Sequence, residues 1–235
     1  MIQTHNHANI IDLEGRYDFY GPIHKGLRRA QCALLVRLGN ADFGDAVTLA
    51  DLVADMRELL DLAAAHIRHE HHHVHDVLRL RGGGVDRLDD QHDDHQASFA
   101  ELEALLDGIE AAAPASRSAL GRRLYLAFSG YVARDLEHML EEETVAAPQL
   151  WSRFSDGELM VIEGQIVGSL APEEAMAFMR LMIPAANPAE RVAMLGGMRQ
   201  QAPREAFDAV IEFAARPTLL PAEFADLADR LELMA

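Results

Sequence analysis

The chain is poor in cysteine and in positive charge. Cys32 is the one cysteine among 235 residues, which excludes a disulfide within the chain and any metal site built from several thiolates. Lysine and arginine number 21 against 38 acidic residues, and the formal net charge is −17. This excess of negative charge argues against electrostatic binding to nucleic acid or to anionic membranes. It suits a protein that gathers cations, although acidic surfaces are common without that role.

Long apolar runs are also missing. No stretch of about 18 apolar residues predicts a membrane span. The first residues, MIQTHNHANIIDLEGRYDF, lack the basic start and the apolar segment of a signal peptide. These two absences lead us to expect a cytoplasmic protein with no membrane partner. The hydrophobic fraction of 49% still provides enough apolar side chains for a real core.

Strand signals are nearly absent, and apolar residues recur three and four positions apart, which predicts an all-α chain. We expect four long helices, separated by breaks such as RGGGVD and AAAPAS. They cover about residues 17–39, 46–80, 86–111 and 116–146, and the last should stop before Pro148. Short connections between long helices predict an antiparallel up-and-down four-helix bundle.

The character of the chain changes near residue 150. Residues 151–235 predict four or five shorter helices, hold seven of the ten methionines and contain no histidine. Four prolines stand where such helices can begin: Pro172, Pro188, Pro203 and Pro221. We therefore expect a histidine-bearing domain over residues 1–150 and an additional C-terminal helical region over 151–235. The methionines should fill the core of this region, and its helices can bind a protein partner.

Histidine is the residue that stands out. Six of the twelve histidines lie in AHIRHEHHHVHDVL, residues 65–78. In an antiparallel bundle the inward-facing stripe of each helix follows an alternating spacing of three and four residues. On the second helix this stripe contains His66, Glu70 and His73, and it ends at Leu80. The other histidines of the stretch fall off the stripe and are expected in solvent: His69, His71, His72 and His75.

The other long helices carry polar residues at a matching place in their stripes, with apolar residues on either side. These are His24 and Gln31 on the first helix, His92 and His95 on the third, and Tyr131, Asp135, His138 and Glu142 on the fourth, whose stripe ends at Val145. Folding the helices back and forth brings these residues to a common level. A buried carboxylate costs several kcal/mol unless it is paired or binds a metal. Two glutamates and at least four histidines in one small volume therefore predict cations.

One ligand pair occurs twice. HIRHEHHHVHDVL at 66–78 and HMLEEETVAAPQL at 138–150 both read His-x-x-x-Glu, with a leucine at the same later offset. A histidine and a glutamate four residues apart lie about 40° apart around a helix, so both can reach one site. The repeat predicts a pseudo-symmetric centre in which two carboxylates bridge two cations and histidines cap them. Imidazole and carboxylate together suit iron, manganese or zinc.

These motifs resemble the haemerythrin-like, or HHE cation-binding, family. The resemblance covers about residues 17–150 and is carried by PIHKGLR, HIRHE, DDQHDDH and HMLEEETVAAPQL. It implies a non-haem centre of two iron ions with bridging carboxylates and terminal histidines. The ligands that it implies are His24, His66, Glu70, His138 and Glu142, with one or both of His92 and His95.

Two departures from the family pattern affect the expected function. The oxygen-carrying members have two histidines four apart on the third helix, whereas His92 and His95 are three apart. Those members also place an aspartate five residues after the last histidine. Glu143 holds that position, but it is rotated about 140° from His138, which favours Glu142. The departures favour an iron-binding, sensing or iron-handling relative over a reversible oxygen carrier.

Three classes of function follow from these observations. The leading one is a binding protein that uses two iron ions to bind dioxygen or a related small ligand such as nitric oxide, or that holds iron, for sensing or storage. The alternative is an enzyme with the same centre that acts on peroxide, nitric oxide or dioxygen, or that takes part in iron–sulfur cluster repair. The third is a metal-free bundle whose C-terminal region binds a protein partner.

Several neighbours of the expected ligands have predicted supporting roles. Gln31, Tyr131 and Asp135 lie at the depth of the ligands and can orient the ligating histidines through hydrogen bonds. His73, one turn beyond Glu70, is expected to line or support the centre. We expect Cys32 to be a small buried apolar residue of the first helix.

Overall fold

The structure is a computed structural model that describes residues 15–233, and every regular element in that range is a helix. The prediction of an all-helical chain is confirmed. Residues 1–14, the start of the expected first domain, and Met234, one of the expected core methionines, lie outside the described range. None of the described helices combines the length and the apolar character needed to cross a membrane.

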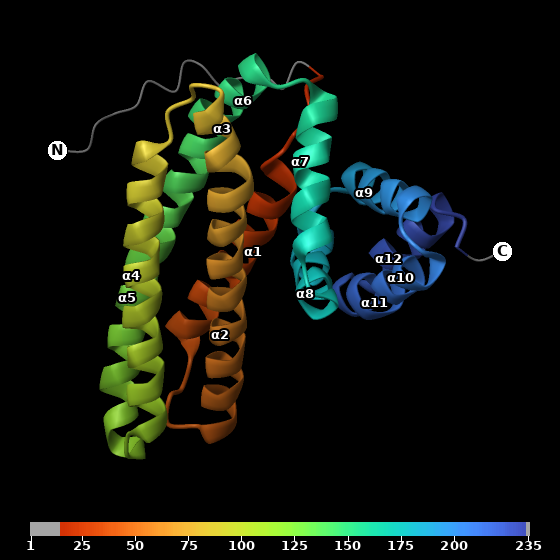
Figure 1. Cartoon of the computed structure of the whole chain (residues 1–235). Coiled ribbons are helices and arrows are strands. Elements are labelled where there is room, and N and C mark those ends of the chain that lie inside the picture. The colour runs from red at the N-terminus through yellow and green to blue at the C-terminus, as the bar shows by residue number, and fades with distance from the viewer. Residues whose placement is uncertain (1–14, 234–235) are drawn as a thin grey trace.

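Four long helices stand side by side with their axes roughly aligned (Figure 1). They are α1 (Gly21–Asn40), α2 (Ala46–His69), α4 (Asp86–Ala111) and α5 (Pro114–Glu141). Both α1 and α4 pack against α2 and against α5, so the contacts close a ring around a shared core. The helix expected over residues 86–111 has these bounds. The first helix begins at Gly21 rather than near residue 17, with Pro22 in its first turn.

Two of the long helices continue through a π-helical segment. After α2 come the first π segment (Glu70–His75) and α3 (Asp76–Leu80). After α5 come the second π segment (Glu142–Ala146) and α6 (Ala147–Arg153). The prediction that the fourth helix stops before Pro148 is therefore wrong. The π segment ends at Ala146, and Pro148 lies in the first turn of α6, where a missing N–H costs little.

Each π segment changes which side chains face inward within it and after it, because a π turn holds about one residue more than an α turn. Leu80 and Val145, predicted to face inward, are 86% and 53% exposed, and His73 is partly exposed. Val74 and Ala146, one position after the predicted ones, are buried instead. The inward positions predicted for His73, Leu80 and Val145 are wrong for this one reason.

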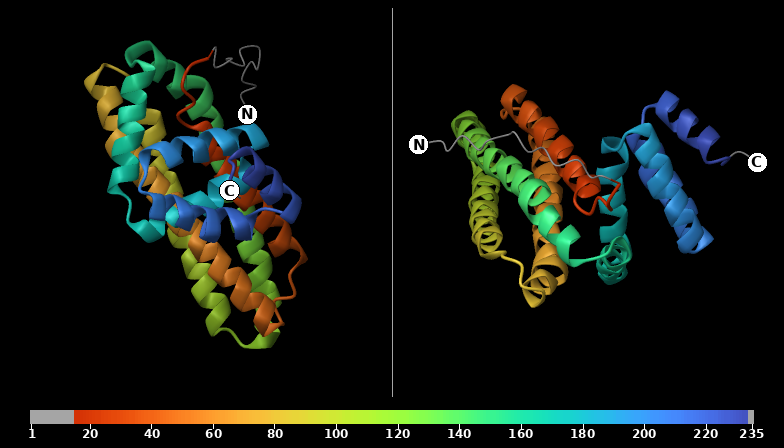
Figure 2. Two further views of the ribbon diagram at one scale, coloured as in Figure 1. Left: turned by 90° about the vertical axis from the view of Figure 1, so that its right-hand side faces the viewer. Right: turned by 90° about the horizontal axis from the view of Figure 1, so that it is seen from above.

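The C-terminal region forms shorter helices that lie to one side of the long ones (Figures 1 and 2). They are α7 (Asp156–Ser169), α8 (Pro172–Met182), α9 (Pro188–Gln201), α10 (Arg204–Val210), α11 (Arg216–Thr218) and α12 (Pro221–Arg230), with a 3₁₀ turn at Ile183–Ala185 and a third π segment at Ile211–Ala215. As expected, Pro172, Pro188 and Pro221 begin helices, and Pro203 directly precedes one. Helix α8 packs against α1 and α2, and α7 contacts the first π segment.

Buried apolar side chains gather in three clusters. The first cluster fills the space between the four long helices. The second lies at the end of these helices that carries α3 and α6, and it also includes residues of α7. The third lies within the C-terminal region. Leu78 and Leu150, the leucines at the matching offset of the repeat, are both fully buried in the second cluster. Cys32 is exposed, so the prediction that it is buried is wrong. Its neighbour Gln31 occupies the inward position of α1.

Candidate metal centre

A polar layer crosses the long helices between the first and second apolar clusters. The structure brings six of the seven predicted ligand residues together there: His24 from α1, His66 from α2, Glu70 and Glu142 from the first positions of the two π segments, His92 from α4 and His138 from α5. The side chain of His66 is 12% exposed, and the other five are at most 3% exposed. The layer is therefore almost completely shielded from water.

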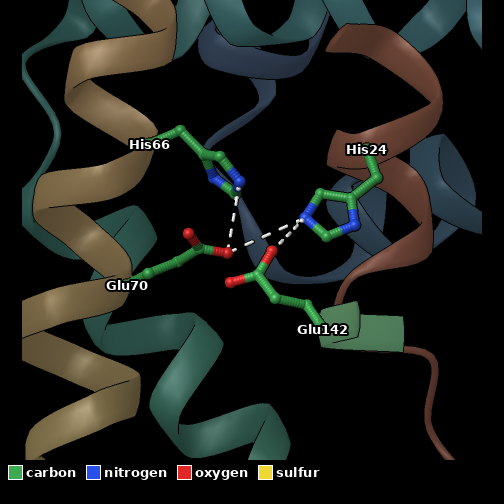
Figure 3. Close-up of side chains that lie close together, drawn as sticks. All are labelled: His24, His66, Glu70 and Glu142. Carbon is green, nitrogen blue, oxygen red and sulfur yellow. Dashed lines mark ion pairs between the residues drawn. The ribbon is translucent and has the colours of Figure 1, made fainter. Parts of the chain in front are cut away.

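One group of ligand atoms consists of His24, His66 and one oxygen from each glutamate (Figure 3). Nε2 of His66 lies 3.2 Å from Oε1 of Glu70. Nε2 of His24 lies 3.8 Å from the same oxygen and 3.2 Å from Oε2 of Glu142. All four ligand atoms lie within 4.8 Å of one another. We call this group the His24–His66 position.

A second group, the His92–His138 position, uses the other oxygen of each glutamate. Nε2 of His92 lies 3.4 Å from Oε2 of Glu70, and Nε2 of His138 lies 3.4 Å from Oε1 of Glu142. The two ring nitrogens are 3.1 Å apart. Donor atoms that share one cation at about 2.0–2.2 Å lie roughly 3–3.5 Å from each other. The shortest separations at both positions match this spacing, and each carboxylate faces both positions.

Most of these ligand atoms have no hydrogen-bond partner among the described residues. Both oxygens of Glu70 and of Glu142, and Nε2 of His24 and of His66, are buried without one. The short nitrogen–oxygen separations therefore do not have hydrogen-bond geometry. An unsatisfied buried polar group costs about 1–3 kcal/mol, and a charged one costs more. These clusters can hold metal ions, and cations between the ligand atoms would remove this cost.

The two glutamates differ in acidity because they are buried together. Burial and the neighbouring charge of Glu70 raise the pKa of Glu142 to about 7. Burial by itself would raise the pKa of Glu70 as well, but the nearby histidines, His66 foremost, outweigh it and hold that pKa well below the ordinary value. At neutral pH the metal-free centre thus has one ionised carboxylate and a second that is partly protonated.

Two of the histidines are held in the neutral form. Burial lowers the pKa of His66 to about 4 and the pKa of His138 to about 2. A neutral imidazole is the form that binds a metal ion. Neither histidine therefore has to lose a proton at pH 7 before it binds a cation.

The outer nitrogens of two histidines have partners that orient the rings. Nδ1 of His24 lies 2.9 Å from Oε1 of Glu143, and Arg28 donates to the same oxygen at 2.5 Å. Nδ1 of His138 lies 2.8 Å from Oε1 of Gln91. A proton on Nδ1 satisfies both acceptors and leaves the Nε2 lone pair for a cation. Glu143 thus contacts the outer side of His24, whereas Glu142 faces the centre.

His95 lies beside the six residues and belongs to neither position. Its Nδ1 is 3.5 Å from Oδ1 of Asp135. Gln31 donates to Asp135 at 2.5 Å and to the hydroxyl of Tyr131 at 3.3 Å. The three residues expected to orient ligands therefore form a network next to His95. Of the two histidines of the third helix, the geometry favours His92.

His75 is the buried histidine that the sequence reasoning missed. It was expected in solvent, but it is fully buried with its ring nearly parallel to that of His92, at a centroid distance of 4.9 Å. The extra residue of the first π segment turns position 75 inward. Its Nδ1 donates to Asp89 at 2.8 Å. With the exposed His71, these residues form a third cluster of ligand-type atoms, but Arg79 already pairs with the carboxylate of Asp89.

Comparisons with models of known protein families, with curated proteins and with solved structures find no match for this chain. The resemblance to the haemerythrin-like family therefore stays a prediction from the motifs.

Proposed function

We propose that the chain is a haemerythrin-like protein that binds two iron ions in an antiparallel up-and-down bundle formed by α1, α2, α4 and α5. One observation carries this proposal. Glu70 and Glu142 bury four carboxylate oxygens that have no hydrogen-bond partner among the described residues, and each carboxylate faces imidazoles on two sides. Two cations would satisfy all four oxygens at once.

The proposed ligands divide into two equal sets. His24 and His66 would hold one ion, His92 and His138 would hold the other, and each glutamate would contribute one oxygen to each ion. Iron suits this mixture of imidazole and carboxylate, and manganese or zinc suits the same donors. His95, the seventh predicted ligand, is left outside both sets by its position next to Asp135.

The centre supports binding of a small molecule better than a purely structural role. The residues would supply each ion with two imidazoles and two carboxylate oxygens, and an iron ion held by so few protein ligands would keep open positions for an outside ligand. We therefore propose that the protein binds dioxygen or a related small ligand such as nitric oxide, in sensing or in iron handling.

Elemental analysis of protein purified without added metal tests the proposal. We expect two iron ions per chain, about one in each of the variants His66→Ala and His138→Ala, and none in the double variant with Glu70→Gln and Glu142→Gln. The matched control is His72→Ala, because His72 is exposed on the same stretch of chain; it should keep both ions. Folded wild-type protein that takes up no ferrous iron under anaerobic conditions would contradict the proposal.

A further inference from the structure

The third cluster of ligand-type side chains lies outside the polar layer, where α4 begins. The chain turns back over residues 81–85, so the first turns of α4 run next to α3 and the end of the first π segment (Figure 1). His71 and His75 come from the π segment and Asp89 from α4, and their ligand atoms lie within 4.8 Å of one another. Nδ1 of His75 is 2.8 Å, and Nδ1 of His71 is 3.5 Å, from Oδ1 of Asp89. Two imidazoles thus converge on one carboxylate oxygen.

Arg79 contacts the opposite side of this carboxylate. Its guanidinium pairs with Oδ2 of Asp89 and also donates to Asp76 at 3.0 Å. Arg79 therefore holds the carboxylate in place through one oxygen and leaves Oδ1 to the two imidazoles.

The cluster extends from the surface to the polar layer. The side chains of His71 and Asp89 are 47% and 23% exposed, so a cation can reach them from water. His75 is fully buried against the ring of His92. Nε2 of His75 has no hydrogen-bond partner among the described residues, so it can carry the proton of the neutral ring without losing a bond. The lone pair of Nδ1 is then available to a cation.

Acidic side chains surround the cluster. Asp86 and Asp93 stand one turn before and one turn after Asp89 on α4, and both are exposed. Asp76, at the start of α3, is exposed as well. Negative potential from such residues raises the local concentration of cations.

We infer that His71, His75 and Asp89 form a third metal site, which binds one divalent cation of the zinc and copper(II) class at the surface. Two imidazoles and one carboxylate are a ligand set of open zinc sites, in which water completes the coordination. The Irving–Williams order ranks ferrous iron low among the divalent metals at such donors, so the site favours a different cation from the one proposed for the polar layer. The inference is independent of the proposed function, because the two sites share no ligand.

Zinc titration by calorimetry tests the inference in the double variant with Glu70→Gln and Glu142→Gln, where the polar layer lacks its carboxylates. We expect one zinc ion per chain. His71→Ala or Asp89→Asn, added to the double variant, should weaken zinc binding at least about tenfold. The matched control is His72→Ala, because His72 is exposed next to His71 and its loss leaves all three ligands in place; it should not change the affinity.

Two further measurements separate this site from the polar layer. In the otherwise unaltered chain, His71→Ala should reduce the number of bound zinc ions by one, whatever the polar layer binds. Electron paramagnetic resonance of the double variant with one equivalent of copper(II) should show two nitrogen ligands. A folded double variant that binds no zinc, or equal losses in His71→Ala and His72→Ala, would overturn this inference and leave the proposed function standing. Wild-type protein that takes up no iron would overturn only the proposed function.

Discussion

Buried charged side chains have different surroundings in the four long helices and in the C-terminal region. In the part of the chain that the structure describes, the C-terminal region buries one charged side chain, Arg191, which donates to a backbone carbonyl and to Glu223, both at 2.9 Å. The polar layer buries Glu70 and Glu142, and none of their oxygens has a hydrogen-bond partner within residues 15–233. A buried charge that the fold satisfies supports the fold itself. A buried charge that the fold leaves unsatisfied indicates a place where something else binds.

The largest expected consequence is that cations stabilise the long helices and not the C-terminal region. Ferrous iron at about 100 times its Kd adds about 2.7 kcal/mol per site, which raises the Tm of a chain of this size by roughly 10–20 °C for two sites. Anaerobic calorimetry with and without a chelator measures this shift. The double variant with Glu70→Gln and Glu142→Gln is the control. A rise of equal size in that variant would show that iron acts elsewhere.

The contribution of the buried neutral histidines His66 and His138 to the stability of the metal-free protein should fall in acid. The groups whose pKa values are raised contribute in the opposite direction: His24, His92 and Glu142. The pKa values of His66 and His138 are lowered to about 4 and about 2 from 6.5, so the unfolded chain binds these protons more readily than the folded chain. The stabilisation is complete above pH 6.5 and is lost as the pH falls toward 4, by about 1.4 kcal/mol per pH unit for each histidine. Urea unfolding between pH 7.5 and pH 5 measures the slope. His138→Gln should reduce the slope and the exposed His72→Gln should not; identical slopes would argue against buried neutral histidines.

Removal of a buried charge should have opposite effects in the two regions. In metal-free protein at pH 8, Glu142→Gln should raise the free energy of unfolding by about 1–3 kcal/mol, because a carboxylate with its pKa raised to about 7 must ionise while buried. Arg191→Met should lower it by about 1–3 kcal/mol, because two acceptors lose their donor. Chemical denaturation of both variants measures the two changes in the free energy of unfolding. Changes of the same sign would remove the contrast between the regions.

The smallest expected effect concerns the residue that orients His24. Glu143→Gln keeps an acceptor near Nδ1 of His24 but loses its charge, so we expect about tenfold weaker iron binding at the His24–His66 position. Competition with a chelator measures the affinity. Glu137→Gln is a matched control on α5, where Glu137 is exposed. Equal affinities of the two variants would mean that Glu143 does not affect the centre.

The sequence pattern predicted the helices and the level of the polar layer well, because both follow from the helical period. The helical period alone predicted that two helices start at residues 46 and 86. It also predicted that His24 meets His66 and Glu142. Distances between helices are not contained in the period of one helix. The contact of Gln91 with His138 therefore could not be predicted from the sequence.

The errors on the second and fourth helices share a cause that lies in the backbone. His75 was expected outside and Leu80 inside, and the structure shows the reverse. One extra residue in a π turn rotates the rest of the helix, and no single residue type predicts such a turn. The error at Cys32 has a different origin, since the preference of cysteine for burial gives way to the phase of α1 that places Gln31 inside.

The two π segments begin at Glu70 and Glu142, the glutamates of the repeated His-x-x-x-Glu pair. The same change from α-helix to π-helix therefore occurs in both copies of the repeat. Leu78 and Leu150 remain equivalent because both helices contain the same additional residue. A prediction that assumes uninterrupted α-helices assigns every residue after the glutamates to a helix face that is wrong by one residue. Removing a single residue from one segment would turn the end of that helix by about 100° against its counterpart. The two copies of the repeat would then match in burial up to the glutamates but no longer at Leu78 and Leu150.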